Sequence, residues 1–227
     1  MIELVVFDMA GTTVHDGDAV NASFRAALSA VGVAVDPAVV NTVMGLPKPE
    51  AIRILLAHSG RSPAEDEVQA IHDDFIRRMS HYYETDPSVR EVAGAAAAFA
   101  ALRQKGIKVA LNTGFSRVIA DVLLRRLGWR SPTVIDDVVT SDEVPRGRPH
   151  PDMIHHLMMC LGIRDAGRVA KVGDTKADLE EGINAGCGLV IGVTSGSFTR
   201  QQLQDCPHSH ILETVAEVPE LVLSRCP

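Results

Sequence analysis

The sequence predicts an α/β protein with a doubly wound, parallel-sheet (Rossmann-like) core and a helical cap inserted after the first strand. Two observations carry this prediction. Apolar, strand-like runs alternate with helix-periodic segments over most of the chain, and such alternation is typical of a parallel sheet with helices on both faces. The alternation is broken in one region near the N-terminus, where helical patterns follow one another without a strand.

Five apolar runs are expected to be strands. Their nearly continuous Val, Ile and Leu content is typical of a parallel sheet that is buried on both faces. Helical patterns separate the later runs, as a doubly wound sheet requires. The expected strands span residues 2–7, 108–112, 134–140, 168–173 and 188–194, and the expected helices span 90–105, 116–127, 151–161 and 176–185.

The interruption extends from Gly17 to Tyr83, where the patterns are helical throughout. An insert directly after the first strand lies over the carboxyl ends of the strands, where α/β sheets bind ligands. Pro87 marks the return of the chain to the sheet. We therefore expect a catalytic core of residues 1–15 and 86–227 and a helical cap of residues 16–85. The last stretch, residues 205–227, is only weakly patterned.

Composition limits the partners and the compartment. The 227 residues carry a net charge of −7, which argues against nucleic acid or an anionic membrane as the main partner. The longest apolar stretch, Val92 to Leu102, is too short to span a bilayer, and no signal peptide is visible. The four cysteines are scattered without a CxxC pair. They predict reduced thiols in a cytoplasmic protein.

Four polar clusters fall at the ends of expected strands or in a loop before a helix. Each alone has an ordinary explanation as a helix cap, a turn or a salt bridge, but the four together in this order are less easily accidental. The clusters are Asp8 with Thr12 and Thr13, "NTGFSR" at 112–117, "GRPHPD" at 147–152 and "GDTKAD" at 173–178.

The acidic members of these clusters predict a metal site. Asp8 and Asp174 lie at the ends of two strands, where they can share a Mg²⁺ ion, a hard cation that prefers oxygen ligands. Asp178 comes four residues after Asp174, so a helix there would place both on one face.

The remaining members suit an anionic group. Thr113 and the amide of Gly114 lie at a strand–helix junction that favours an anion, and Arg148 supplies a further positive charge. In this arrangement Asp8 would attack phosphorus and form an aspartyl-phosphate that water then cleaves.

The order DxxGT, S/T-G, a basic residue and GDxxxD resembles the haloacid dehalogenase superfamily, and the resemblance covers essentially the whole chain. Within that superfamily, five segments most resemble the phosphonoacetaldehyde hydrolases, or phosphonatases. These segments are "FDMAGTT", "MGLPK", "NTGFSR", "GRPHP" and "KVGDTKADLEEGINAG". The resemblance implies hydrolysis of a carbon–phosphorus bond with Mg²⁺, substrate contacts from Thr12, Gly114 and Met44, and a homodimer formed through the cap.

Ala10 is the residue that separates phosphonatases from most phosphatases of the superfamily. Phosphatases have an aspartate two residues after the nucleophile, where it protonates the departing alkoxide; phosphonatases have alanine, as this chain has Ala10. Protonating an oxygen does not help to break a P–C bond, whereas an amine that condenses with the substrate aldehyde does. Ala10 would then supply only its backbone carbonyl to the metal.

Lys48 is the predicted amine. It matches the position of the family's Schiff-base lysine in "MGLPK", after Met44 and Gly45. Pro49 is suited to the first turn of a helix, so Lys48 lies beside the positive end of that helix. The helix dipole and desolvation under a cap both favour the free amine that a Schiff base requires.

One departure from the family concerns proton transfer. Phosphonatases carry a histidine in the helical turn after the lysine, where this chain has Ala51. His58 and His15 are alternative histidines, although each is more typical of a surface position. The chain is also shorter toward its C-terminus, which suggests a sister enzyme with a related phosphonate substrate.

Four other functions fit part of this pattern. A Mg²⁺-dependent phosphomonoesterase would share Asp8 and the metal but would need an acid at Ala10. A haloacid dehalogenase would use no metal, against which the acids of "GDTKAD" argue. A phospho-receiver module is about half this length and lacks the insert. A degenerate member that only binds phosphate is distinguished by the absence of turnover.

Overall fold

The structure is a computed structural model that describes residues 1–224. Its six strands form one all-parallel sheet in the order β3-β2-β1-β4-β5-β6. The strand order reverses between β1 and β4, which is the point where open α/β sheets bind ligands. The strands are β1 (Leu4–Asp8), β2 (Lys108–Thr113), β3 (Asp137–Thr140), β4 (Val169–Gly173), β5 (Leu189–Val193) and β6 (His210–Leu212).

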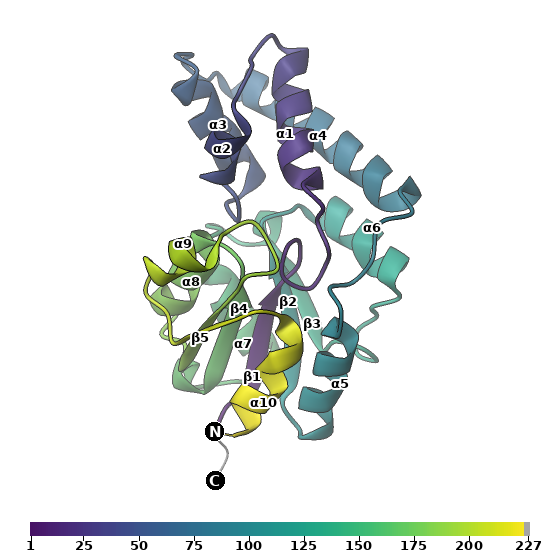
Figure 1. Cartoon of the computed structure of the whole chain (residues 1–227), viewed down its shortest axis with the longest axis vertical. Coiled ribbons are helices and arrows are strands. Elements are labelled where there is room, and N and C mark those ends of the chain that lie inside the picture. The colour runs from purple at the N-terminus through teal and green to yellow at the C-terminus, as the bar shows by residue number, and fades with distance from the viewer. Residues whose placement is uncertain (225–227) are drawn as a thin grey trace.

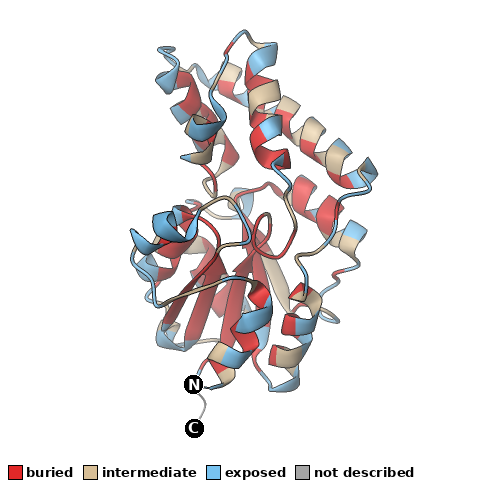
Figure 2. Ribbon diagram, in the orientation of Figure 1, coloured by how far each residue is buried: buried red, intermediate tan, exposed pale blue. Residues whose placement is uncertain are grey.

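Helices cover both faces of this sheet (Figure 1). Their contacts follow the alternation of side chains along β1: Val5 and Phe7 pack with α5, α6 and α10, whereas Leu4 and Val6 pack with α7. Figure 2 shows that the strands are buried almost throughout. The flanking helices are α5 (Ala95–Gln104), α6 (Arg117–Leu127), α7 (Asp152–Leu161), α8 (Lys176–Asn184), α9 (Arg200–Gln204) and α10 (Val218–Leu223).

Four helices follow β1 and lie above the carboxyl ends of the strands (Figure 1). They form the predicted helical insert. Its interior includes the rings of Phe24 and Phe75, whose centroids are 4.5 Å apart. Tyr83 and Phe75 also contact Phe115 at the start of the α6 region, so the insert packs on the sheet domain. The division into residues 16–85 and the remainder stays a prediction. The helices are α1 (Ala19–Ala30), α2 (Pro37–Asn41), α3 (Lys48–His58) and α4 (Glu65–Thr85).

Two expected elements are shorter in the structure. The strand expected from residue 134 begins at Asp137, because the chain still turns at Val134, whose N–H donates to the Arg130 carbonyl. The helix expected from residue 90 begins at Ala95. Gly94 precedes it with a φ of 88°, which is not helical geometry.

The weakly patterned end of the chain contains β6, a parallel partner of β5, and α10. Three residues of β6 are too few to give a readable strand pattern. Cys160, Cys187 and Cys206 are free thiols, and Cys226 lies outside the described residues. Within residues 1–224, none of the helices has both the length and the apolar character needed to cross a membrane.

Candidate active site

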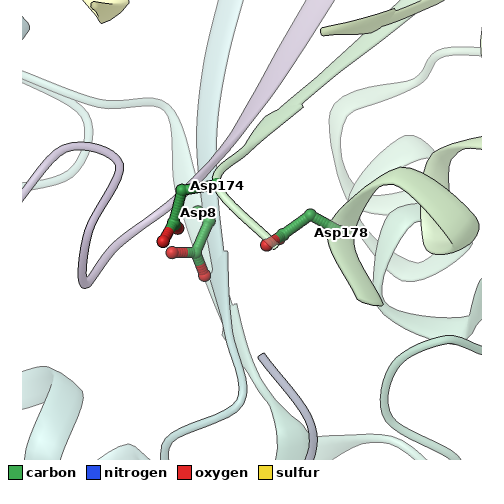
Figure 3. A group of neighbouring side chains, drawn as sticks. All are labelled: Asp8, Asp174 and Asp178. Atoms are coloured by element: carbon green, nitrogen blue, oxygen red, sulfur yellow. The ribbon is translucent and has the colours of Figure 1, made fainter. Parts of the chain in front are cut away.

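Three buried carboxylates meet at the carboxyl edge of the sheet (Figure 3). Asp8 ends β1, Asp174 directly follows β4, and Asp178 lies in the first turn of α8. One oxygen of each lies within 4.8 Å of the others. The structure therefore brings together the three side chains that the sequence predicts as metal ligands.

The local structure of α8 fixes Asp178 in a way that the four-residue spacing did not predict. Asp174 is not helical, because α8 begins only at Lys176. Thr175 caps the helix: its N–H and hydroxyl donate to Asp178 Oδ2 at 3.2 and 2.5 Å. The expectation that Asp174 and Asp178 share a helical face is therefore wrong, and a capping box brings Asp178 to the site instead.

Asp174 is held by neutral donors. Thr12 Oγ1 donates to its Oδ1 at 2.9 Å and the Ser197 N–H donates to its Oδ2 at 2.7 Å. Gly11, with a φ of 91°, leaves no room for a side chain beside this carboxylate. Burial raises the pKa of Asp174 to about 8, and the neighbouring charges of Asp8 and Asp178 contribute.

Arg148 is buried among the other acids. Its Nη1 lies 2.6 Å from Asp8 Oδ1 and 3.0 Å from Asp178 Oδ1, and its Nε donates to Glu181 Oε2 at 3.0 Å. Its Nη2 donates to the Asn112 carbonyl at 2.8 Å. Such a multiply bonded guanidinium is held in one orientation beside the carboxylate of Asp8.

Lys171 adds a second buried cation beneath the first. Its Nζ lies 2.9 Å from Asp178 Oδ1 and 3.2 Å from Glu181 Oε2, and it donates to Asn112 Oδ1 at 2.6 Å. The Asn112 amide in turn donates to both oxygens of Glu181 at 2.9 Å. The floor of the site is thus a network of buried charges joined by ion pairs and amide hydrogen bonds.

These neighbours act differently on the other two acids. Burial raises the pKa of Asp8 above its ordinary value, although the opposing charge of Arg148 limits the rise. Burial alone would also raise the pKa of Asp178, but Arg148 and Lys171 outweigh it and hold that pKa below its ordinary value. Asp178 is therefore the most firmly ionised of the three carboxylates.

The three acids fit a divalent cation such as Mg²⁺. Hard cations prefer carboxylate and carbonyl oxygens, which this cluster supplies. Within residues 1–224, no ion pair engages Asp174, so its charge has no compensation except from neutral hydrogen-bond donors. A cation at this position would relieve the repulsion that raises the pKa of Asp174.

Lys48 approaches the site from the insert. It is the first residue of α3, with Pro47 before it and Pro49 after it, and it is only 4% exposed. Its Nζ lies 4.9 Å from the centre of the Phe115 ring and 5.5 Å from that of Phe24. Its amine also donates one long hydrogen bond, of 3.4 Å, to the Leu46 carbonyl.

This apolar setting changes the chemistry of the amine. Burial lowers the pKa of Lys48 to about 8, although Asp8 opposes the shift by favouring the charged form. Two aromatic faces stabilise an ammonium only modestly. A substantial fraction of Lys48 is therefore the free amine just above neutral pH, which a nucleophilic lysine requires.

Lys48 and Asp8 line one small cavity of about 20 Å³, which has room for about one water molecule. The insert closes it tightly: a side-chain carbon at Gly114 would lie 2.6 Å from the Leu46 carbonyl oxygen. The cavity brings together most of the predicted catalytic and substrate residues. Its lining includes Asp8, Ala10, Met44, Lys48, Thr113, Gly114 and Arg148.

Thr12, the remaining predicted substrate contact, is fully buried, and its hydroxyl donates to Asp174. Three further members of the site, Asn112, Lys171 and Glu181, have no role assigned from the sequence, although Asn112 belongs to the "NTGFSR" cluster. Asn112 and Lys171 look like ordinary strand residues, and only the position of Glu181, one helical turn after Asp178, signals a shared face. Of the alternative histidines, His58 is exposed at the end of α3, and His15 lines a neighbouring cavity.

The sequence matches the haloacid dehalogenase-like hydrolases over residues 2–186. The chain therefore belongs to this family of hydrolases, and its buried Asp8, Asp174 and Asp178 group is typical of the family's magnesium site. The chain is also similar to curated proteins that are named phosphonoacetaldehyde hydrolases. It is 30% identical to the phosphonoacetaldehyde hydrolase of Bacteroides fragilis, over 98% of this chain and 89% of that protein.

A second relative has the same name. The phosphonoacetaldehyde hydrolase of Bacillus cereus is 29% identical over 96% of this chain and 86% of that protein. Two crystal structures share the fold. A hydrolase from Pseudomonas syringae has a TM-score of 0.89 and 16% identity, over 99% of this chain and 100% of that one. A phosphonoacetaldehyde hydrolase-like protein from Oleispira antarctica has a TM-score of 0.82 and 22% identity, over 98% of this chain and 92% of that one.

Proposed function

We propose that this protein hydrolyses the carbon–phosphorus bond of phosphonoacetaldehyde or a related 2-oxo-phosphonate. The observation that carries the proposal is the pairing of two nucleophiles in one cavity. Asp8 faces it from the sheet and the Lys48 amine faces it from the insert. The relatives named as phosphonoacetaldehyde hydrolases support the same substrate class.

The two nucleophiles would divide the reaction. The Lys48 amine condenses with the carbonyl carbon, water leaves, and a positively charged imine forms. Asp8 then attacks phosphorus, and the P–C electron pair moves toward the imine to give an enamine. The aspartyl-phosphate is cleaved by water, and hydrolysis of the imine formed from the enamine frees Lys48.

The other residues hold the phosphonate. Arg148 is buried beside Asp8 and supplies the positive charge that lets one anion approach another. Thr113 and the Gly114 amide line the same cavity between β2 and α6, where an oxyanion would be favoured. Met44 lines the side of the cavity that belongs to the insert.

Asp8, the Ala10 carbonyl, Asp174 and Asp178 would hold Mg²⁺. When bound, Mg²⁺ supplies positive charge for the phosphonate oxygens during the attack. Asp174, whose charge has no cationic partner among the described residues, contributes most to metal affinity, while Asp178 is already held by Arg148 and Lys171.

Ala10 argues for this reaction over a phosphomonoesterase. An alkoxide leaving group needs a proton donor close to the bridging oxygen. Ala10 lines the cavity at the position two residues after Asp8 and offers no acidic side chain. A leaving group that departs as an enamine needs no such acid. The homodimer through the cap remains a prediction from the family resemblance.

A substrate screen tests the proposal. Wild type should release phosphate from phosphonoacetaldehyde with Mg²⁺ and should lose that activity in excess chelator. Lys48→Arg keeps a charge but forms no imine, so it should lose C–P cleavage almost completely. Lys105→Arg, at the exposed end of α5, is the matched control. If wild type cleaves only phosphate esters, or if Lys48→Arg still cleaves the phosphonate, the proposal is wrong.

A further inference from the structure

Asp16 lies beside the site, and the proposed reaction leaves it unused. It occupies the loop that leads into α1, four residues before Val20 and eight before Phe24. Val20 lines the catalytic cavity, and Phe24 lies under the Lys48 amine. The Val20 N–H donates to the two Asp16 carboxylate oxygens at 3.3 and 3.4 Å. One side of α1 and its leading loop thus faces the site.

A second cavity of about 330 Å³ joins Asp16 to this site. Asp16 lines it with other polar residues of the same loop and of α1. Met44 and Ser197 line both this cavity and the small catalytic one, so the two cavities adjoin. The larger one has room for several water molecules next to the place where Lys48 faces Asp8.

We propose that Asp16 is the proton-transfer partner of Lys48, which gives protons to and takes them from the amine and the carbinolamine through water in the adjoining cavity. The inference rests on the proposed imine chemistry. It assigns this work to a carboxyl group of the α1 loop, in a chain that has Ala51 one turn after Lys48.

The proton balance of imine formation shows what Asp16 does. The neutral Lys48 amine adds to the carbonyl carbon, and the C=O electron pair becomes an alkoxide that takes the extra proton from nitrogen. Protonated Asp16 then gives its proton to the carbinolamine hydroxyl. The C–O bond breaks, water leaves with that electron pair, and the nitrogen lone pair forms the C=N bond. Hydrolysis of the product imine reverses these steps and returns the proton to Asp16.

The two groups are well matched for this exchange. Burial raises the pKa of Asp16 to about 6, and burial lowers the pKa of Lys48 to about 8. Moving a proton from the Lys48 ammonium to the Asp16 carboxylate is therefore unfavourable by a factor of about 100. For the ordinary pKa values of 10.5 and 3.8, the same transfer would be unfavourable by more than about a millionfold.

Other charged and titratable groups around Asp16 have different surroundings. Lys48 of α3 favours its charged form, while Asp8 of β1 and Asp18 of the same loop disfavour it. Burial raises the pKa of Tyr83 of α4 well above its ordinary value, and the negative charge of Asp16 adds to this rise. His15 lines the larger cavity as well. Asp121 of α6 lines neither cavity and pairs with Arg117 at 3.6 Å, with its side chain 57% exposed, so it provides a matched control.

The experiment measures how fast Lys48 is labelled by phosphonoacetaldehyde in excess cyanoborohydride, from pH 5 to 9. The reactive form has Asp16 protonated and Lys48 unprotonated. The population of this form is constant between the two pKa values, so the wild-type rate should be level between about pH 6 and 8 and fall on both sides. Asp16→Asn keeps the shape and an acceptor for Val20. It should slow labelling about 100-fold at pH 7 and lose the level region, because the rate then follows the free Lys48 amine alone and falls below about pH 8, while Asp121→Asn behaves as wild type.

The outcomes separate this inference from the proposed function. If Asp16→Asn is labelled at the wild-type rate with the wild-type pH profile, Asp16 has no role in proton transfer, although the imine mechanism stands. If wild type is not labelled at all, the imine mechanism itself is wrong. Should Asp16→Asn fail to fold, the wild-type profile decides: a rate that falls steadily below pH 8, with no level region down to about pH 6, contradicts the inference.

Discussion

Lys171 and Lys48 are both almost completely buried, but the two regions around them treat a positive charge in opposite ways. In the sheet domain, Lys171 lies within 3.2 Å of Asp178 and Glu181 and also bonds to Asn112. In the insert, Lys48 has two aromatic rings and one long hydrogen bond to a carbonyl. Lys171 is paired, whereas Lys48 is desolvated and has no ion pair with any residue in the described range 1–224.

This difference explains how one small site holds both a fixed electrostatic framework and a reactive amine. Pairing keeps charges in place, because each buried ion is compensated by an opposite one. Desolvation without pairing favours the uncharged form and so makes an amine nucleophilic near neutral pH. The sheet domain provides the framework and the insert provides the amine.

The largest expected effect removes the nucleophile from the paired region. Asp8→Asn keeps the size of the side chain but removes the charge that attacks phosphorus, so turnover should fall by at least about a thousandfold. Phosphate release measures the loss, and circular dichroism should show an unchanged fold. Near-normal turnover would show that Asp8 is not the nucleophile.

Breaking the paired region at its centre should destabilise the fold. Arg148→Met would leave Asp8, Asp178 and Glu181 without their shared cation. The cost should be about 3–5 kcal/mol of unfolding free energy, measured by urea denaturation at low Mg²⁺. Arg146→Met removes a pair between Arg146, whose side chain is 60% exposed, and Asp152, and should cost about 0–1 kcal/mol. Equal losses in the two variants would contradict the distinction.

Replacing the buried lysine of the desolvated region should stabilise the fold, in contrast to the loss expected for Arg148→Met. Lys48→Met removes an amine that is expensive to bury charged and replaces it with an apolar chain of similar length. The free energy of unfolding at pH 7 should rise by about 1–3 kcal/mol, while C–P cleavage is lost. Lys176→Met, which removes a surface pair with Glu180 at 3.5 Å, should change stability little. A destabilised Lys48→Met would mean that Lys48 is paired after all.

A smaller effect should appear in the pH dependence of that gain. The pKa of Lys48 is about 8 in the folded protein, against an ordinary value of 10.5. Between these values the unfolded chain binds more protons, so the stability of wild type rises with pH relative to Lys48→Met. The difference in unfolding free energy between Lys48→Met and wild type should be largest below pH 8 and should disappear as the pH approaches 10.5. A difference that stays constant over this range would contradict a lowered pKa.

Much of this architecture was predictable from the sequence because it depends on local patterns. Apolar runs and helical periodicity predict the sheet and the insert, and residues at the ends of parallel strands must meet at one edge. Asp8 and Asp174 were predicted in this way, whereas Asp178 was predicted from a four-residue helical spacing that the structure does not have. The capping box of Thr175 and Asp178 places it instead.

The partners of these residues depend on contacts between distant segments and were not predictable. Asn112, Lys171 and Glu181 come from β2, β4 and α8, and nothing in each segment alone shows that they form one network. The apolar surroundings of Lys48 likewise depend on Phe24 and Phe115, which reach it from α1 and the loop before α6. Strand β6 was missed because three residues carry too little pattern.

The most direct test of the account compares the two buried lysines in one measurement. Borohydride added with phosphonoacetaldehyde should fix substrate carbon to Lys48, which mass spectrometry of the digested protein detects as a mass increase on its peptide. Lys171, which is equally buried but paired with Asp178 and Glu181, should remain unlabelled, as should the exposed Lys176. Label on Lys48 alone is the predicted result. Label on Lys171, or an unlabelled Lys48 in an enzyme that cleaves the phosphonate, would contradict the account.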